Sequence, residues 1–115
     1  MNMSFIYTTE QVRNRTKTVT RRGIGTWKNL KPGDRLNAVE KGMGLKKGEK
    51  VKVLAVIEVV SVRVEALCSI TPLDVVAEGF PSLTRGEFVM CFCDGFGCTA
   101  SDRVRRIEFK YVDSA

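Results

Sequence analysis

Residues 51–64 constrain the fold more than any other part of this sequence. β-Branched residues dominate the segment, and apolar side chains occupy both sets of alternating positions in its middle. This pattern predicts one long β-strand that is buried on both sides at its centre, with Lys52 and Arg63 reaching solvent near its ends. A long strand of this kind is typical of a closed or half-closed β-barrel with helices packed outside.

Three shorter strands are predicted around the long one. Residues 35–40 follow a turn over residues 30–34 that has Pro and Gly at its centre. Residues 104–112 alternate apolar and polar side chains, which is typical of a half-buried antiparallel strand. The short apolar run over residues 4–7 is a candidate opening strand.

Short helices are predicted to begin at three capping threonines: Thr8, Thr71 and Thr84. The second of these helices is expected to end at Gly79, with Glu78 as its last residue. A carboxylate at that end opposes the helix dipole, so we expect it to be either solvated or paired with a cation. The 115 residues contain no linker or internal repeat, which predicts a single α+β domain over residues 1–115.

The composition excludes several kinds of chemistry. The sequence has no histidine, which removes the commonest general base and every histidine-containing metal site. Its four cysteines form no C-x-x-C pair, so we expect buried thiols and predict no metal site and no cofactor: Cys68, Cys91, Cys93 and Cys98. No apolar run approaches the ~18 residues of a spanning helix and no secretory signal opens the sequence, so we expect a cytoplasmic protein.

The segment of residues 13–22 is the strongest candidate for a binding site. It contains five Lys or Arg residues and no Asp or Glu, and the chain as a whole carries a net charge of +6. A basic segment interleaved with threonine hydroxyls suits a phosphate-bearing ligand, although such a segment can also be ordinary solvated surface. The candidate ligand-binding residues are Arg13, Arg15, Thr18, Arg21 and Arg22. Trp27 is added as a candidate for base stacking, with a place in the hydrophobic core as the alternative.

The order of these motifs resembles that of ASCH domains. The resemblance covers nearly the whole chain and is carried by residues 11–13, 17–22, 30–34 and 107–109. It implies a fold similar to PUA domains, which is a small β-barrel of five or six strands with flanking short helices around a cleft. It also implies RNA binding. Residues 42–50, a glycine-rich basic loop, resemble the small ASCH proteins of bacteriophage and prophage genomes.

One branch of the ASCH family consists of bacterial amidohydrolases that deacylate N4-acetylcytidine. Its motif Lys-Thr-x-Thr-x-Arg falls on residues 17–22, and its glutamate falls on Glu78. The resemblance implies a base, a nucleophile and a proton shuttle at Lys17, Thr20 and Glu78, in that order. Lysine is a plausible base here because nearby arginines can lower its pKa. Residues three apart on a regular strand point to opposite faces, so Lys17 and Thr20 converge only if the segment turns or bulges.

Three functions therefore remain open from the sequence. The first is binding of RNA or a modified nucleoside or nucleotide in a basic cleft. The alternative is an amidohydrolase that acts on N4-acylated cytidine, and a ribonuclease is the third. In the binding hypothesis, Glu78 would only form a salt bridge to Lys17 or Arg22.

Overall fold

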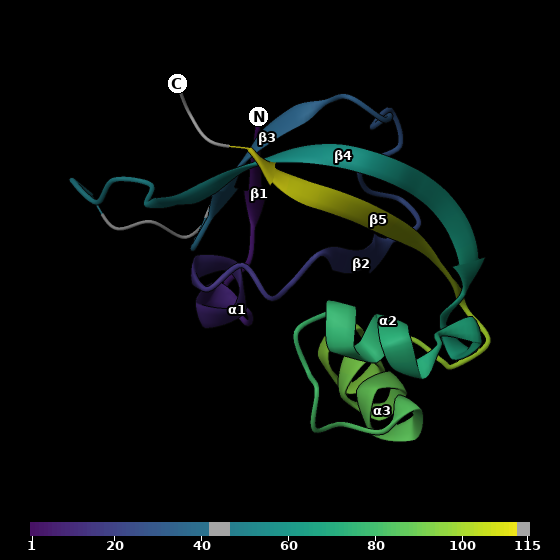
Figure 1. The fold of residues 1–115 in the computed structure, drawn as a ribbon. Coiled ribbons are helices and arrows are strands. Elements are labelled where there is room, and N and C mark those ends of the chain that lie inside the picture. Colours follow the sequence, from purple (N-terminus) through teal and green to yellow (C-terminus); the bar gives the residue numbers. More distant parts are fainter. Residues whose placement is uncertain (42–46, 113–115) are drawn as a thin grey trace.

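Five strands form one mixed sheet in the computed structural model, which describes residues 1–41 and 47–112 (Figure 1). The strands are β1 (Asn2–Ser4), β2 (Val19–Gly23), β3 (Arg35–Val39), β4 (Val53–Ala66) and β5 (Arg103–Val112). Their order across the sheet is β1-β3-β4-β5-β2. β1 is parallel to β3, and the other neighbouring pairs are antiparallel.

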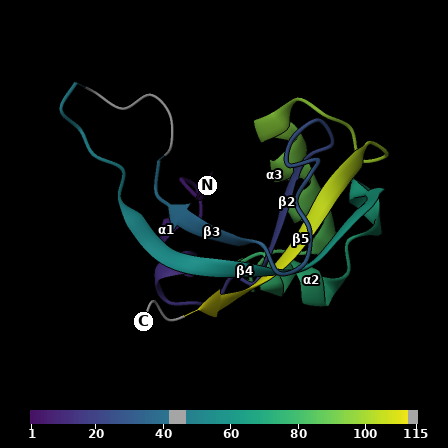
Figure 2. The same ribbon diagram turned by 90° about the horizontal axis from the view of Figure 1, so that it is seen from above.

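Short helices connect the strands and lie near the two ends of the sheet. Helix α1 (Thr9–Arg13) follows β1, whereas α2 (Pro72–Ala77) and α3 (Arg85–Phe96) lie together between β4 and β5 in the sequence. A single 3₁₀ turn, Leu67–Ser69, leads from β4 toward α2. Figures 1 and 2 show β4 and β5 as one long, curved pair that joins the part of the molecule around α1 to the part around α2 and α3.

The α+β class and its short helices are confirmed, but the sheet is not closed into a barrel. The edge strands are β1 and β2, and no backbone pairing joins them in the part of the chain that the structure describes. β1 has only three residues, because the chain turns away toward α1 after Phe5. A side chain bridges the opening instead: Arg22 Nη2 on β2 donates to the backbone oxygen of Ser4 on β1 at 2.7 Å.

The long strand is confirmed as β4, which begins two residues later than the predicted range. Its pairing with β5 shifts register between Val59 and Ser61, and such a bulge increases the local bend of a strand. The opening strand lies at Asn2–Ser4 and not at residues 4–7. Ile6 and Tyr7 are exposed because the chain is already turning there.

Two of the three predicted helix caps are confirmed. The Thr71 hydroxyl accepts from the Asp74 N–H at 3.2 Å, and Thr84 and Glu87 form a reciprocal capping box. Thr8 makes no side-chain cap at α1. Gln11, three residues after Thr8, donates from Nε2 to the backbone oxygen of Gly79 at 3.2 Å, so that side chain joins α1 to the end of α2.

The hydrophobic core has two parts. One lies between the sheet and α1 and includes Met3, Phe5, Val12, Leu36, Ile57, Ile107 and Phe109. The other lies under α2 and α3 and includes Leu67, Ile70, Val75, Phe88 and Val104. The cysteines are less buried than predicted: Cys68 and Cys91 are exposed, and the half-buried Cys93 and Cys98 have their sulfurs 3.6 Å apart. Cys93 and Cys98 pack at the margin of the second core.

Residues 42–46 of the predicted basic loop lie outside the described residues. Within the described ranges, no helix is long and apolar enough to cross a membrane. Those same ranges contain no group of three or more Cys, Asp or Glu side chains placed to hold a metal ion.

Candidate functional site

Lys17 and Glu78 meet where the segment before β2 passes the end of α2. The Thr18 N–H donates to the backbone oxygen of Ala77 at 2.8 Å, and the Phe109 N–H donates to the Thr18 oxygen at 2.9 Å. These bonds fix the segment between α2 and β5. Lys17 Nζ then donates to the Glu78 backbone oxygen at 2.7 Å and to Oε1 of its carboxylate at 2.9 Å. Both side chains are almost completely buried.

Gly79 allows α2 to end this close to α1. Its φ of +105° lies in the left-handed region that favours glycine. A Cβ at this position would also lie 2.8 Å from Cγ of Gln11. A glycine is therefore needed directly after Glu78, both for the turn and for the close approach of Gln11.

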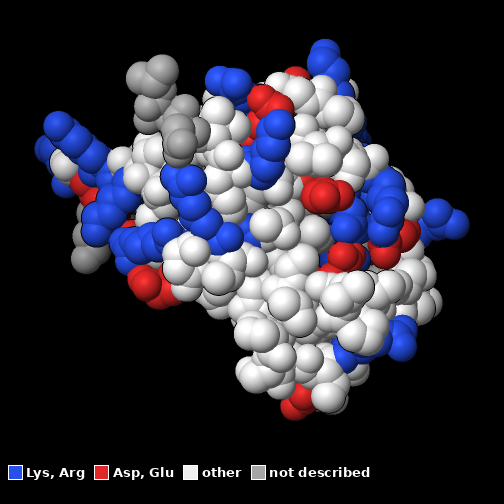
Figure 3. Space-filling view, viewed as in Figure 1, with Lys and Arg blue, Asp and Glu red and all other residues white. Residues whose placement is uncertain are grey.

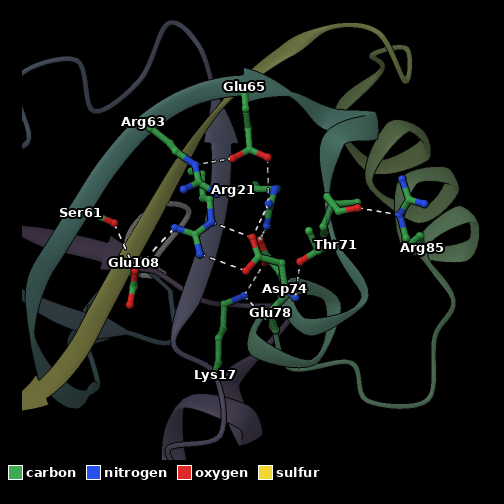
Figure 4. Close-up of polar contacts among 12 residues, drawn as sticks. Lys17, Arg21, Ser61, Arg63, Glu65, Thr71, Asp74, Glu78, Arg85 and Glu108 are labelled. Atoms are coloured by element: carbon green, nitrogen blue, oxygen red, sulfur yellow. Dashed lines mark hydrogen bonds and ion pairs between the residues drawn. The ribbon is translucent and has the colours of Figure 1, made fainter.

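Arg21 lies at the centre of a buried charge network (Figure 4). Its Nη1 donates to the second carboxylate oxygen of Glu78 at 2.9 Å, and its Nη2 donates to Asp74 at 2.7 Å. Nη2 also contacts Glu65 on β4 at 3.4 Å, and the Arg21 side chain is 0% exposed. Arg106 on β5 completes the network by binding Asp74 through Nε and Nη2, at 2.7 and 3.0 Å. We refer to these six residues as the charge network: Lys17, Arg21, Glu65, Asp74, Glu78 and Arg106.

Burial and pairing displace several pKa values in the network. Burial lowers the pKa of Lys17, and Glu78 partly opposes this effect because it stabilises the ammonium. The charges of Arg22 and Arg21 lower it further. Hydrogen bonds from Arg106, and then from Arg21, hold the pKa of Asp74 at about 2 against the opposing effect of burial.

Thr20 belongs to a second set of contacts, on the other face of β2 from Arg21. Its hydroxyl accepts a hydrogen bond from Arg22 Nε at 3.2 Å, and the hydroxyl-bearing side chain is buried. The Arg22 guanidinium also lies 4.9 Å from the centre of the Phe5 ring. Burial lowers the pKa of Arg22 to about 10.

The three predicted catalytic residues are all buried, but they are not in one continuous set of hydrogen bonds. Lys17 and Glu78 are bonded to each other, whereas no hydrogen bond in the described ranges joins Thr20 to either of them. Arg22 connects the two sets electrostatically. Its charge lowers the pKa of Lys17, and the charge of Glu78 raises the pKa of Arg22. Lys17 precedes β2 and is therefore free of the strand alternation that would place it opposite Thr20.

The other predicted ligand-binding residues lie in different surroundings. Arg13 is half-exposed and pairs with Glu10 at 2.6 Å, and Arg15 lies 5.4 Å from the centre of the Tyr111 ring. Thr18 makes its hydrogen bonds to Ala77 and Phe109 through its backbone N–H and oxygen. Trp27 is half-buried against the first core cluster with a φ of +55°, which agrees with the core alternative.

Sequence reasoning missed Asp74 and Arg106 as members of the site. The alternating pattern over residues 104–112 predicts that its polar positions, Arg106 among them, are exposed, and the sequence marks Asp74 only as an acid in the first turn of a helix. The structure buries Arg106 because α2 covers the face of β5 on which it lies and supplies Asp74 as its partner. The phenol of Tyr111 was also missed, although it donates to the Lys17 backbone oxygen at 2.6 Å.

Comparison with known proteins identifies the type of fold. No protein-family model matches this sequence. No curated protein matches it significantly. Among solved structures, three are similar to it over most of their own length.

The ASCH domain from Lactobacillus crispatus JV V101 is 14% identical, with a TM-score of 0.59 over 96% of this chain and 77% of that one. Protein EF3133 from Enterococcus faecalis V583, of the family DUF984, is 16% identical, with a TM-score of 0.64 over 93% of this chain and 71% of that protein. The hypothetical protein PH0355 is 16% identical, with a TM-score of 0.63 over 97% of this chain and 96% of that protein. The class of protein is thus α+β with an open mixed sheet. More particularly, its fold is similar to that of the ASCH domain from Lactobacillus crispatus.

Proposed function

We propose that residues 1–115 act as one ASCH domain that binds a modified nucleoside or nucleotide, free or within RNA, beside the charge network. The observation that carries this proposal is that Lys17 and Arg21 share one buried carboxylate, that of Glu78. Burying a charge costs free energy of desolvation, and groups with displaced pKa values are concentrated at functional sites. The proposed chemical class of the ligand is supported by the similarity to an ASCH domain structure and by the Lys-Thr-x-Thr-x-Arg motif at residues 17–22.

A nucleobase suits these residues better than a chain of phosphates does. Lys17 and Arg21 are 3% and 0% exposed in their side chains, and each is already paired with a carboxylate. Neutralising a phosphate backbone requires exposed cations, which here include Arg13 but neither of these two. Arg22 is less buried than these two, and the guanidinium N–H groups that it does not use on Thr20 and Ser4 can donate to the carbonyl groups of a base.

A second candidate function, deacylation of N4-acylated cytidine, is favoured by the lowered pKa of Lys17. A neutral Lys17 amine would take the proton of the Thr20 hydroxyl, whose oxygen would attack the amide carbonyl. The acyl group would pass to Thr20, and the amine of cytidine would leave with a proton delivered through Glu78. Water would then hydrolyse the acyl-threonine ester and restore the hydroxyl. Arg22, which already donates to Thr20 Oγ1, would stabilise the oxyanion.

The test follows binding and turnover separately. Wild type, Thr20→Ala and Thr26→Ala are mixed with N4-acetylcytidine, and cytidine release is followed by chromatography while binding is measured by calorimetry. Thr26→Ala is the matched control, because its hydroxyl donates only within an exposed turn, to the Gly23 oxygen at 2.8 Å. Loss of turnover in Thr20→Ala alone, with binding retained, would establish the hydrolase.

Binding without turnover in all three proteins would establish a binding domain. Absence of both binding and turnover with free nucleosides directs the test to short RNA that carries the same base. If that RNA is neither bound nor cleaved, the proposal is wrong. Cleavage of unmodified RNA would support the ribonuclease alternative instead.

A further inference from the structure

The exposed cations of this protein are separate from the charge network. A pocket lies where the turn after β1 meets the end of β3 and the segment before β4, and its lining residues are Ile6, Glu40, Lys41, Glu49, Lys50 and Lys52. On the face shown in Figure 3, Lys and Arg side chains gather at the end of the molecule where this segment lies. We refer to this region as the hairpin pocket.

The ion pairs of the hairpin pocket are long and exposed. Lys41 approaches Glu49 at 3.8 Å, and Lys52 approaches Glu40 at 3.8 Å. The Lys52 side chain is 74% exposed, and Arg13 lies 3.9 Å from Glu40 at the same rim. Pairs at these distances are not hydrogen-bonded and contribute little to stability. A phosphate can therefore recruit these cations without disrupting the fold, which it could not do with Lys17 and Arg21.

The carboxylates of the region do not cancel its positive charge. Three cations line the pocket, namely Lys41, Lys50 and Lys52, and Arg13 approaches its Glu40. Lys47 belongs to the same segment before β4. The acids are Glu10, which is bonded to Arg13 at 2.6 Å, with Glu40 and Glu49. Within residues 1–41 and 47–112, neither Lys47 nor Lys50 has a carboxylate within ion-pair distance. The region therefore keeps a net positive charge and has cations available for an anion.

An exposed aromatic residue is the sequence neighbour of a residue that lines the pocket. Tyr7 directly follows Ile6, which lines the pocket, and it is 87% exposed. This exceeds the exposure of every other aromatic side chain that the structure describes. Lysines that hold phosphates beside a ring on which a base can stack are the usual elements of a surface that binds single-stranded nucleic acid.

We propose that the hairpin pocket binds the phosphodiester backbone of a single-stranded nucleic acid, with Tyr7 stacking on a base. This surface goes beyond the nucleoside site proposed above, because it uses other residues and other elements. Its lysines neutralise the backbone, so affinity falls with salt, whereas binding of an uncharged nucleoside beside the charge network does not.

The experiment measures fluorescence anisotropy of a labelled single-stranded RNA of mixed sequence over a series of salt concentrations. The test variant is Lys41→Gln/Lys50→Gln/Lys52→Gln. The matched control is Lys28→Gln/Lys31→Gln/Lys110→Gln, which removes the same charge from exposed positions elsewhere. We expect the test variant to lose roughly tenfold in affinity or more, and its slope of log K against log salt to be shallower by about 2, since three phosphate contacts are removed.

Tyr7→Ala is compared with Phe96→Ala, which removes another exposed aromatic ring. We expect only Tyr7→Ala to weaken binding. Equal losses in the two lysine variants would overturn the proposal, because they would indicate a general effect of net charge. Failure of the wild type to bind both this RNA and single-stranded DNA of the same sequence would also overturn it, and binding to anionic phospholipid vesicles instead would indicate a membrane surface as the partner. Wild-type RNA binding that depends on the hairpin pocket would stand even if N4-acetylcytidine is not bound.

Discussion

Lys17 donates to Glu78 twice, to its carboxylate at 2.9 Å and to its backbone oxygen at 2.7 Å. The backbone oxygen belongs to the last turn of α2, where unpaired carbonyls concentrate negative charge. A carboxylate at this end of a helix is unfavourable by itself. The ammonium of Lys17 and the guanidinium of Arg21 compensate both the carboxylate and the helix end. The position of Glu78, unfavourable by sequence criteria, is therefore stabilised by tertiary contacts.

Glu78→Gln is expected to destabilise the protein strongly. The substitution keeps the shape of the side chain but leaves two buried cations without their shared anion. Breaking a buried ion pair typically costs about 3–5 kcal/mol in the free energy of unfolding, which urea denaturation measures. The pKa of Lys17 should fall further, because the carboxylate that raises it is gone. NMR titration of the Lys17 side chain tests this second effect.

The control for Glu78→Gln is Glu58→Gln, which removes a carboxylate that pairs with Arg35 and Lys110 at the surface. It should leave stability almost unchanged. If the two variants are equally stable, the buried pairing does not matter to the fold. If Lys17 keeps its wild-type pKa in Glu78→Gln, the electrostatic coupling inferred here is absent.

Asp74 should make stability depend on pH in the acid range. The pKa of Asp74 is about 2 in the folded protein, below its usual value of 3.8. Its contribution to stability is therefore fully present above the pKa of the unfolded chain and is lost as pH falls from about 4 through about 2. Asp74→Asn should be less stable than wild type at pH 7, and the difference should shrink below pH 4. Thermal unfolding followed by circular dichroism from pH 2 to pH 7 measures this, with the exposed Asp94→Asn as control. A gap between wild type and Asp74→Asn that is constant over this range would contradict the assignment.

The local features of this fold could be predicted from the sequence, since they depend on near neighbours. β4 follows from the β-branched residues of its own segment, and the caps at Thr71 and Thr84 need only the next three residues. The salt bridge between Lys17 and Glu78 was also among the sequence hypotheses, whereas the bond from Arg21 to the same carboxylate was not.

The charge network could not be predicted from local sequence. All charged residues of the segment 13–22 are cations, which suggested an exposed basic surface. The acids that pair with Lys17 and Arg21 in the interior lie 44 to 61 positions further along the chain. The opening between the edge strands β1 and β2 could not be predicted from the sequence for a similar reason. The strand pattern of Val19–Gly23 does not reveal which strand it pairs with, and Arg22 reaches β1 through its side chain only.

Tyr111 is expected to support Lys17 through its backbone. Its phenol donates to the Lys17 oxygen at 2.6 Å, and burial raises the pKa of Tyr111 to about 12. Tyr111→Phe should lose about 1 kcal/mol of stability, typical of one hydrogen bond, while the ring stays packed against Phe109. The exposed Tyr7→Phe is the control. Between pH 10 and 12 the wild type should lose stability because only the unfolded chain ionises this phenol, and Tyr111→Phe should not show this loss. An identical loss of stability between pH 10 and 12 in the wild type and in Tyr111→Phe would contradict this role of Tyr111.

Arg22 should hold the two edges of the sheet together. Its guanidinium donates to the Ser4 oxygen at 2.7 Å and to Thr20 Oγ1 at 3.2 Å, and it stacks on Phe5. In Arg22→Gln these contacts are lost, so amide hydrogen exchange should accelerate in β1 and the start of β2, with stability lower by about 2 kcal/mol. The pKa of Lys17 should rise, because the charge of Arg22 lowers it in the wild type.

The matched control for Arg22→Gln is Arg35→Gln, on the exposed face of β3, where the arginine pairs with Glu58 at 3.2 Å. It removes the same charge and should change neither the exchange of β1 nor the pKa of Lys17. Arg22→Lys keeps the charge but cannot reach two acceptors in the fork geometry of the guanidinium. It should therefore leave the pKa of Lys17 close to that of the wild type while β1 still exchanges faster. Slow exchange in all three variants would mean that β1 is held by its pairing with β3 alone.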